Sequence, residues 1–268
     1  MTATDTVFAG SIPAIYHSHL GPLLFEPFAW DIAERTAALD PHHILETAAG
    51  TGIVTGALIR EAPKAEIYAT DLNQAMLDVA AGRIMSWRVT FRQADAQDLP
   101  FPDASFDALV CQFGVMFFPD RVAAYREARR VLKPGGRFLF NVWDSLERNP
   151  VSRAAAEAVA GLFPPDPPDF LARVPFGHHD KAAIEADLRA AGFAEIAAET
   201  VRKPSPVASA RDAALGLTHG SPLRAEIEAH GEGSLARAAE AVETALSRLG
   251  FDRGAEAPMS AHVFTAQA

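Results

Sequence analysis

The sequence contains one cysteine in 268 residues, and this scarcity restricts the chemistry available to it. A lone thiol, Cys111, can form neither an internal disulfide nor a cysteine-based metal cluster. Basic residues are also few, since 24 Lys and Arg stand against 34 Asp and Glu, for a formal net charge of −10. Nucleic acids and anionic lipids require a positive surface. We therefore expect no metal site, no nucleic-acid partner and no membrane insertion.

Long apolar runs are missing as well. Residues 106–118 come closest to a membrane span, but Asp107 and Gln112 interrupt them. Residues 1–5 show no basic region leading into an apolar one, so no secretory signal is predicted. With 49% hydrophobic and 22% charged residues, the composition is that of an ordinary globular protein. Together these features predict a cytoplasmic protein.

Strand and helix patterns alternate along the first half of the chain. Short apolar runs between turn signals predict strands at 43–47, 66–70, 89–92, 106–111 and 137–143. Periodicity and end signals predict helices at 51–61, 73–81 and 121–132, with Asn73 as a cap, Gly82 as a stop and a turn at 133–136. A further helical stripe covers 25–39. Such alternation predicts an α/β fold with a parallel sheet and right-handed crossovers.

This rhythm breaks after Trp143. Helical patterns follow at 151–162 and 181–191, and we expect His178-His179 to begin the second helix. Strands are predicted at 193–201 and 259–265. We expect a single domain over 1–268. Its parts are a core of about 40–144, 178–206 and 256–268, a helical cap from insertions at about 145–177 and 207–250, and an N-terminal lid at 1–39.

A glycine turn follows the first predicted strand and is the most informative feature. Gly50 and Gly52 allow the backbone to turn sharply and to approach a ligand closely. The next helix would then direct its first amides at an anionic group. Asp71 ends the second strand, where a carboxylate can accept hydrogen bonds from both hydroxyls of a ribose. The pattern predicts a pocket for an adenosine-containing cofactor at the carboxyl edge of the sheet.

The glycine spacing separates two kinds of cofactor. A dinucleotide fingerprint, G-x-G-x-x-G, would place its third glycine at position 55. That residue is Thr55, and Gly56 comes one place late. A nicotinamide-dependent oxidoreductase thus remains an alternative, but it does not explain Asp95 or the turn at 133–137.

Five ordered segments resemble the motifs of class I S-adenosylmethionine (SAM)-dependent methyltransferases, and of the methyltransferase type 11 subgroup in particular. These segments are 45–52, 70–72, 94–101, 106–110 and 131–138. The resemblance implies a Rossmann-like, seven-stranded, mostly parallel sheet with an antiparallel last strand, helices on both faces and a helical cap. It also implies SAM as cofactor, S-adenosylhomocysteine as product, and an enzyme that methylates a small molecule.

The same resemblance assigns roles to individual residues. Asp71 would bind the ribose and Asp95 the adenine amine. Other residues would contact the methionine end, the adenine or the adjoining walls, and they are Tyr16, Glu46, Ala48, Gly50, Gly52, Leu72, Met76, Ala96 and Gln112. Ala48 replaces the family's usual first glycine. Each of these residues also has a purely structural interpretation, such as a polar strand end for Glu46 or a helix cap for Asp71.

The sequence indicates the methyl acceptor less clearly than the cofactor. Methyl transfer from a sulfonium can be driven by positioning, so a catalytic dyad is not required, and none stands out. Tyr16 and His219 are the candidates for a catalytic role, although the catalytic residues stay unknown. We expect a small, largely apolar metabolite methylated on oxygen, carbon or nitrogen, and a monomer or homodimer. A non-catalytic SAM-binding scaffold is the second alternative.

Overall fold

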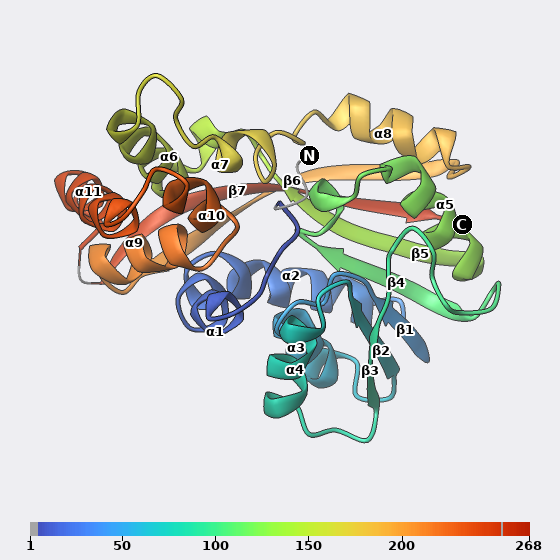
Figure 1. Cartoon of the computed structure of the whole chain (residues 1–268). Helices are drawn as coiled ribbons and strands as arrows, with labels where there is room; N and C mark the ends of the chain where they lie inside the picture. The colour runs from blue at the N-terminus through green and yellow to red at the C-terminus, as the bar shows by residue number, and fades with distance from the viewer. Residues whose placement is uncertain (1–4, 253) are drawn as a thin grey trace. The chain divides into compact units, whose positions relative to one another are not determined.

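The computed structural model describes residues 5–252 and 254–268, and these form a seven-stranded sheet (Figure 1). The strands lie in the order β3-β2-β1-β4-β5-β7-β6. Their bounds are β1 His43–Glu46, β2 Glu66–Asp71, β3 Val89–Gln93, β4 Phe106–Gln112, β5 Leu132–Trp143, β6 Glu195–Val207 and β7 Ala255–Gln267. Strands β1 to β5 pair in parallel, and the last strand, β7, runs antiparallel to β5. The expected Rossmann-like sheet is confirmed.

Helices connect and flank these strands. In the described residues their bounds are α1 Ile12–Ile15, η1 Tyr16–Phe25, α2 Glu26–Ala37, α3 Ile53–Glu61, α4 Gln74–Arg83, η2 Val115–Phe117, α5 Arg121–Val131, η3 Leu146–Arg148, α6 Pro150–Leu162, α7 Phe170–Arg173, α8 Lys181–Ala190, α9 Ala210–His219, α10 Leu223–Glu228 and α11 Ser234–Arg248. None of these helices has the length and apolarity needed to cross a membrane.

The chain divides into two compact units. One, the sheet unit, comprises residues 28–143, 178–201 and 261–268; the other, the helical unit, comprises the remaining described residues. In the sheet unit, side chains of β5 alternate between two layers. Leu139 packs in a core with residues of α2 and α3, whereas Phe138 and Phe140 contact Tyr125 of α5 from the opposite face. The sheet is therefore covered on both faces, as a parallel sheet requires.

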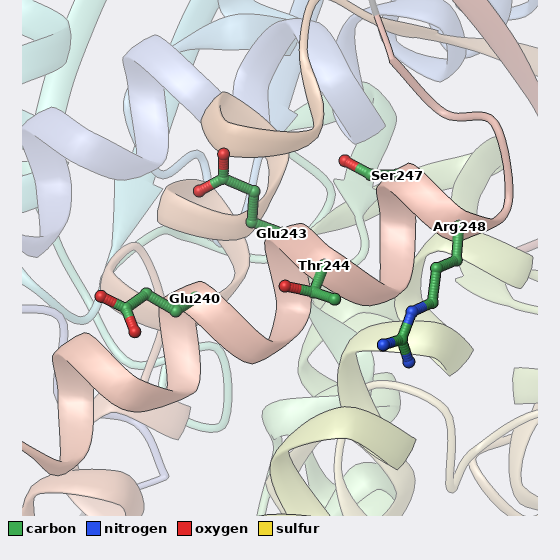
Figure 2. Close-up of a pocket in the computed structure, with 5 residues that line it drawn as sticks. All are labelled: Glu240, Glu243, Thr244, Ser247 and Arg248. Atoms are coloured by element: carbon green, nitrogen blue, oxygen red, sulfur yellow. The ribbon is translucent and has the colours of Figure 1, made fainter.

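The helical unit is stabilised by packing and by a partly buried group of charges around Arg173. Helix α11 packs against α6 and α9. Arg173 forms ion pairs with Asp5, at 2.7 Å, and with Glu226, at 2.6 Å. An open depression follows one side of α11, and Figure 2 shows its lining residues, which are Glu240, Glu243, Thr244, Ser247 and Arg248. Their mixed charges and their position along a single helix are typical of a solvated face.

The helical stripe predicted at 25–39 is only the end of a longer helical stretch. Residues 12–37 are helical throughout, and the central part, Tyr16–Phe25, is a π-helix that contains Pro22. A proline removes an amide donor and crowds the preceding turn, so a wider helix accommodates it there. Gly21 and Pro22 are usual breakers, and this is why the sequence did not indicate the stretch.

Two local expectations, on Gly82 and on His178-His179, were wrong, and that on Asn73 was correct in position only. Gly82 does not stop its helix, since α4 continues to Arg83, and Asn73 occupies the N-cap position without a side-chain capping bond. His178 and His179 precede α8, which Asp180 caps by accepting hydrogen bonds from the amides of Ala182 and Ala183. At the start of α8 the side chain of Asp180 therefore sets the boundary rather than the histidines.

The predicted turn at 133–136 is absorbed into a strand. β5 begins at Leu132, but its pairing with β4 jumps from Leu132 to Arg137 across a bulge. Gly135 has φ +82° there, and a Cβ on Gly136 would lie 2.9 Å from the Lys133 carbonyl oxygen. Glycine is required at this bulge because the backbone folds tightly upon itself.

Candidate functional site

The carboxyl ends of four adjacent strands bring together most of the predicted site residues. Glu46 ends β1, Asp71 ends β2, Asp95 follows β3 and Gln112 ends β4. Because β3, β2, β1 and β4 are neighbours and run in parallel, these four ends lie along one edge of the sheet. Ligands of open α/β sheets bind at this edge. All of these residues belong to the sheet unit.

The glycine turn between β1 and α3 is anchored to both neighbouring strands. The Thr47 amide donates to the Val110 carbonyl at 2.9 Å, and the Ala49 amide donates to the Thr70 carbonyl at 2.9 Å. Gly50 and Gly52 have φ +56° and +79°, a region that favours glycine. A Cβ on Gly52 would lie only 2.7 Å from Cδ1 of Ile84. The turn therefore has one tightly fixed conformation, with its backbone close to the first turn of α3.

Ala48 shares this left-handed conformation, with φ +52°. The position at which the family has glycine thus needs the same backbone geometry here, and alanine adopts it at some energetic cost. A Cβ on Gly114, just beyond β4, would lie 2.5 Å from the Ala48 Cβ and 2.7 Å from Cys111 Sγ. Gly114 is therefore a structural requirement of the site that sequence reasoning missed. Its signal was only the glycine two places after Gln112.

Asp71 is buried and fixed by the backbone. Its Oδ2 accepts a hydrogen bond from the Gly50 amide at 2.9 Å, and its Oδ1 accepts one from the Asn73 amide at 2.8 Å. Burial raises the pKa of Asp71, and these amide donors oppose that rise. A carboxylate has about four acceptor positions, so capacity remains for donors from a ligand. The geometry suits a pair of adjacent hydroxyls, as a ribose provides.

Glu46 lies below the turn and is 2% exposed. Its Oε2 accepts a hydrogen bond of 2.6 Å from the Thr55 hydroxyl. Burial raises the pKa of Glu46 to about 8, and the nearby charge of Asp71 adds to this rise while the Thr55 hydroxyl opposes it. Thr55 occupies the position where a dinucleotide fingerprint has its third glycine. Here the residue is a fully buried partner of Glu46, a role that the motif alone did not indicate.

The remaining candidates vary in exposure. Met76 is buried under the turn, and a Cβ on Gly50 would lie 3.4 Å from its Cε. Leu72 is 50% exposed next to Asp71, a position where a flat apolar group could cover it. Asp95 is exposed, and its carboxylate accepts a hydrogen bond from the Gln97 amide at 2.8 Å. Ala96 lies between them in the same loop and is partly buried.

Gln112 is partly buried at the end of β4, beside β5. Its Oε1 accepts from Asn141 Nδ2 at 3.5 Å, and the Phe113 amide donates to Asn141 Oδ1 at 2.9 Å. Asn141 is itself fully buried. The amide of Gln112 is therefore oriented by a neighbouring strand, while part of the side chain stays accessible.

Tyr16 and His219 belong to the helical unit. The Tyr16 ring stacks on Phe25 with centroids 4.8 Å apart. His219 is the last residue of α9, and its Nδ1 lies 2.8 Å from the Thr218 hydroxyl. Burial lowers the pKa of His219. Their roles in cofactor binding or catalysis stay predictions.

The sequence is similar to known methyltransferases. A family described as a methyltransferase domain, of the type 11 kind, matches residues 45–140. A demethylmenaquinone methyltransferase from Deinococcus radiodurans is 39% identical over 109 residues, which are 40% of this chain and 45% of that protein. A ubiquinone/menaquinone biosynthesis C-methyltransferase from Saccharophagus degradans is 32% identical over 176 residues, 60% of this chain and 71% of that protein. The chain thus matches less than half the length of the first relative and most of the second.

Solved structures share the fold. A SAM-dependent methyltransferase from Aquifex aeolicus has a TM-score of 0.54 at 18% identity, covering 70% of this chain and 91% of that one. The phosphoethanolamine N-methyltransferase 2 of Haemonchus contortus, solved with S-adenosylmethionine, has a TM-score of 0.59 at 18% identity, covering 95% of this chain and 56% of that one. Fold, motif order and sequence identity agree, and the chain belongs to the class I SAM-dependent methyltransferases of the type 11 kind, a family whose cofactor is S-adenosylmethionine.

Proposed function

We propose that this protein binds SAM at the carboxyl edge of β1 to β4 and transfers its methyl group to a small, largely apolar metabolite. The observation that carries the proposal is Asp71, a buried carboxylate held by two backbone amides with acceptor capacity left for a ribose. When bound, SAM supplies an activated methyl carbon: the acceptor atom forms a bond to it as the carbon–sulfur bond breaks, and S-adenosylhomocysteine leaves.

Different residues around the glycine turn would bind different parts of SAM. Gly50 and Gly52 hold the turn open for close approach, and the amides at the start of α3 favour the carboxylate of the methionine end. Glu46 lies deeper and would interact with that end through its carboxyl group. Leu72 and Ala96 would flank the adenine, with Asp95 near its amine. Gln112 would face the methionine or the acceptor.

The acceptor is proposed from the relatives and from the composition of the chain. The names of the Deinococcus and Saccharophagus proteins refer to menaquinone and ubiquinone precursors, which are apolar ring compounds. This chain matches those proteins only in part, so we extend to it the class of a small apolar acceptor and not a particular quinone. Positioning of that acceptor would supply much of the rate, with effective molarities of about 10⁵ M or more.

Calorimetry with S-adenosylhomocysteine tests the cofactor site. We expect the wild type to bind it and Asp71→Ala to lose at least about tenfold in affinity, or roughly 1.4 kcal/mol. Asp78→Ala is the matched control, because Asp78 is an exposed carboxylate on α4 that accepts a hydrogen bond from Gln74 in the same helix. Undiminished binding by Asp71→Ala, or no binding by the wild type, would refute the assignment.

A second experiment separates catalysis from simple binding. Labelled SAM incubated with a metabolite extract should yield a labelled product, and its absence would favour a non-catalytic SAM-binding protein. Fluorescence enhancement of NADH on mixing would instead support an oxidoreductase. Thr55 argues against that outcome, since its side chain fills the space that a third glycine would leave open.

A further inference from the structure

Four polar side chains of the sheet unit have a buried atom without a hydrogen-bond partner among the described residues, and one of them is His43, at the start of β1. The other three lie together near α5 and α8. They are Arg121, through Nε, Tyr125, through its hydroxyl, and His178, through Nε2. Tyr125 is 0% exposed and His178 is 8% exposed. A buried polar atom without a partner costs about 1–3 kcal/mol, so three such atoms in one region call for a ligand.

The three side chains gather on one side of the sheet. Arg121 and Tyr125 are four residues apart on α5 and so lie on the same face of that helix. His178 lies just before α8, and α8 packs beside α5 (Figure 1). Electrostatic interactions link Arg121 to both other residues. The cluster is therefore local, with Arg121 near both other side chains.

The cluster lies toward the edge of the sheet that carries the proposed cofactor site. The Tyr125 ring contacts Phe140, near the carboxyl end of β5, with centroids 5.6 Å apart. Arg121 is one turn closer to the N-terminus of α5, and that end follows the carboxyl end of β4 along the chain. The polar groups thus lie on the α5 side of the β4 and β5 ends.

The charges of the cluster favour a negative ligand. Arg121 is partly buried and its Nε atom is fully buried, and no ion pair joins it to an acidic side chain among the described residues. Burial raises the pKa of Tyr125, which keeps its hydroxyl a donor. Burial and Arg121 lower the pKa of His178 to about 4, so its ring is neutral at pH 7. Two carboxylates lie near the cluster: Asp180 is engaged as the cap of α8, and Asp187 of α8 interacts electrostatically with Tyr125.

We propose that Arg121, Tyr125 and His178 form a binding site for an oxyanion, the carboxylate or phosphate group of a small molecule. The Arg121 Nε and the Tyr125 hydroxyl are donors, and a neutral imidazole presents a donor at Nε2 in one of its tautomers. An oxyanion offers several acceptor lone pairs to all three and neutralises the guanidinium. The site goes beyond the proposed methyl transfer and does not depend on it.

Thermal unfolding with added anions tests this site. Inorganic phosphate and acetate are the probes, each compared with sodium chloride at equal ionic strength and pH 7. We expect a saturable rise in Tm with at least one probe, and a fivefold or greater loss of apparent affinity in Tyr125→Phe and in Arg121→Gln. Without a probe, Tyr125→Phe should melt at the same temperature as the wild type or higher, because it removes an unpartnered hydroxyl and keeps the ring.

Tyr68→Phe is the matched control. Tyr68 also lies in the sheet unit and packs its ring against Phe101 and Phe106, and the proposal gives its hydroxyl no role. Its affinity for the probe should equal that of the wild type. If neither anion stabilises the wild type beyond chloride, or if Tyr125→Phe binds the probe as tightly as the wild type, the proposal is wrong and a buried water would account for the three groups.

Two further measurements distinguish the source of the anion and separate this proposal from methyl transfer. S-adenosylhomocysteine should bind Tyr125→Phe as it binds the wild type, so failure of the cofactor assignment would leave the anion result intact. If Tyr125→Phe reduces labelling of carboxylated aromatic acceptors but not of their neutral counterparts, the oxyanion belongs to the methyl acceptor. If it affects neither class while probe binding is lost, the site binds a separate anion.

Discussion

Replacing Glu46 by glutamine should make the protein less sensitive to rising pH. Glu46 is buried and has a pKa of about 8 in the folded protein, against 4.5 when solvated. The unfolded chain therefore releases this proton at a lower pH than the folded protein does. Stability is fully present below pH 4.5 and falls as the pH rises towards 8. Glutamine keeps an acceptor for Thr55 and cannot ionise.

The size of the effect follows from the two pKa values. A shift of one pKa unit corresponds to about 1.4 kcal/mol. From pH 5 to pH 8 the wild type should lose about 3–4 kcal/mol through Glu46 that Glu46→Gln does not lose. This is a large share of a typical stability of about 5–15 kcal/mol. Asp71, whose pKa is also raised, is present in both proteins, and because its charge interacts with that of Glu46 the difference between the curves includes this coupling.

Denaturant unfolding at pH 5, 6, 7 and 8 measures this difference. The relevant quantity is the slope, because an amide group buried in place of the carboxyl adds a penalty that does not vary with pH. Glu61→Gln is the control: Glu61 is exposed on the following helix, and its curve should follow that of the wild type. Parallel curves for Glu46→Gln and the wild type would refute the argument that Glu46 is buried in its protonated form.

Three other perturbations have defined outcomes. Gly52→Ala should lower stability by about 1–3 kcal/mol in thermal melts, because position 52 has a positive φ and the new Cβ would lie 2.7 Å from Ile84 Cδ1. Gly56→Ala is the control: its Cβ would meet open space, and the change should raise stability by about 0.5–1 kcal/mol. Asp107 has a lowered pKa through its bonds to Lys133 and two amides, so Asp107→Asn should be destabilised at pH 6, with the gap closing as the pH falls below 3.8 in denaturant titrations. Arg173→Leu should cost about 3 kcal/mol or more in chemical denaturation, because it leaves the buried Asp5 without its cation; a loss within 0.5 kcal/mol would contradict this.

Local sequence patterns were sufficient to predict an element where one interaction determines it. Four strands in the first half of the chain, β1, β2, β4 and β5, are largely apolar and mostly buried, and burial of such runs leaves few alternatives, whereas β3 is mostly exposed. The glycine turn was also predictable from the sequence, because the positive φ at Gly50 and Gly52 favours glycine. The strands predicted at 193–201 and 259–265 are present as β6 and β7, but their full lengths were not predicted. The π-helix at Tyr16–Phe25 was not predicted either, since partners distant in sequence help to determine such elements.

The sequence alone determined the order of strands and helices, the turn and the acids at strand ends, because these depend on residues close together in the chain. Only the tertiary structure decided which groups meet. It buried Glu46 against Thr55 and placed Gly114 against Ala48. It also left buried polar atoms of Arg121, Tyr125 and His178 without hydrogen-bond partners among the residues that the structure describes. Burial is a property of the packed chain, and it is burial that sets the pKa of Glu46 and makes an unpaired donor costly.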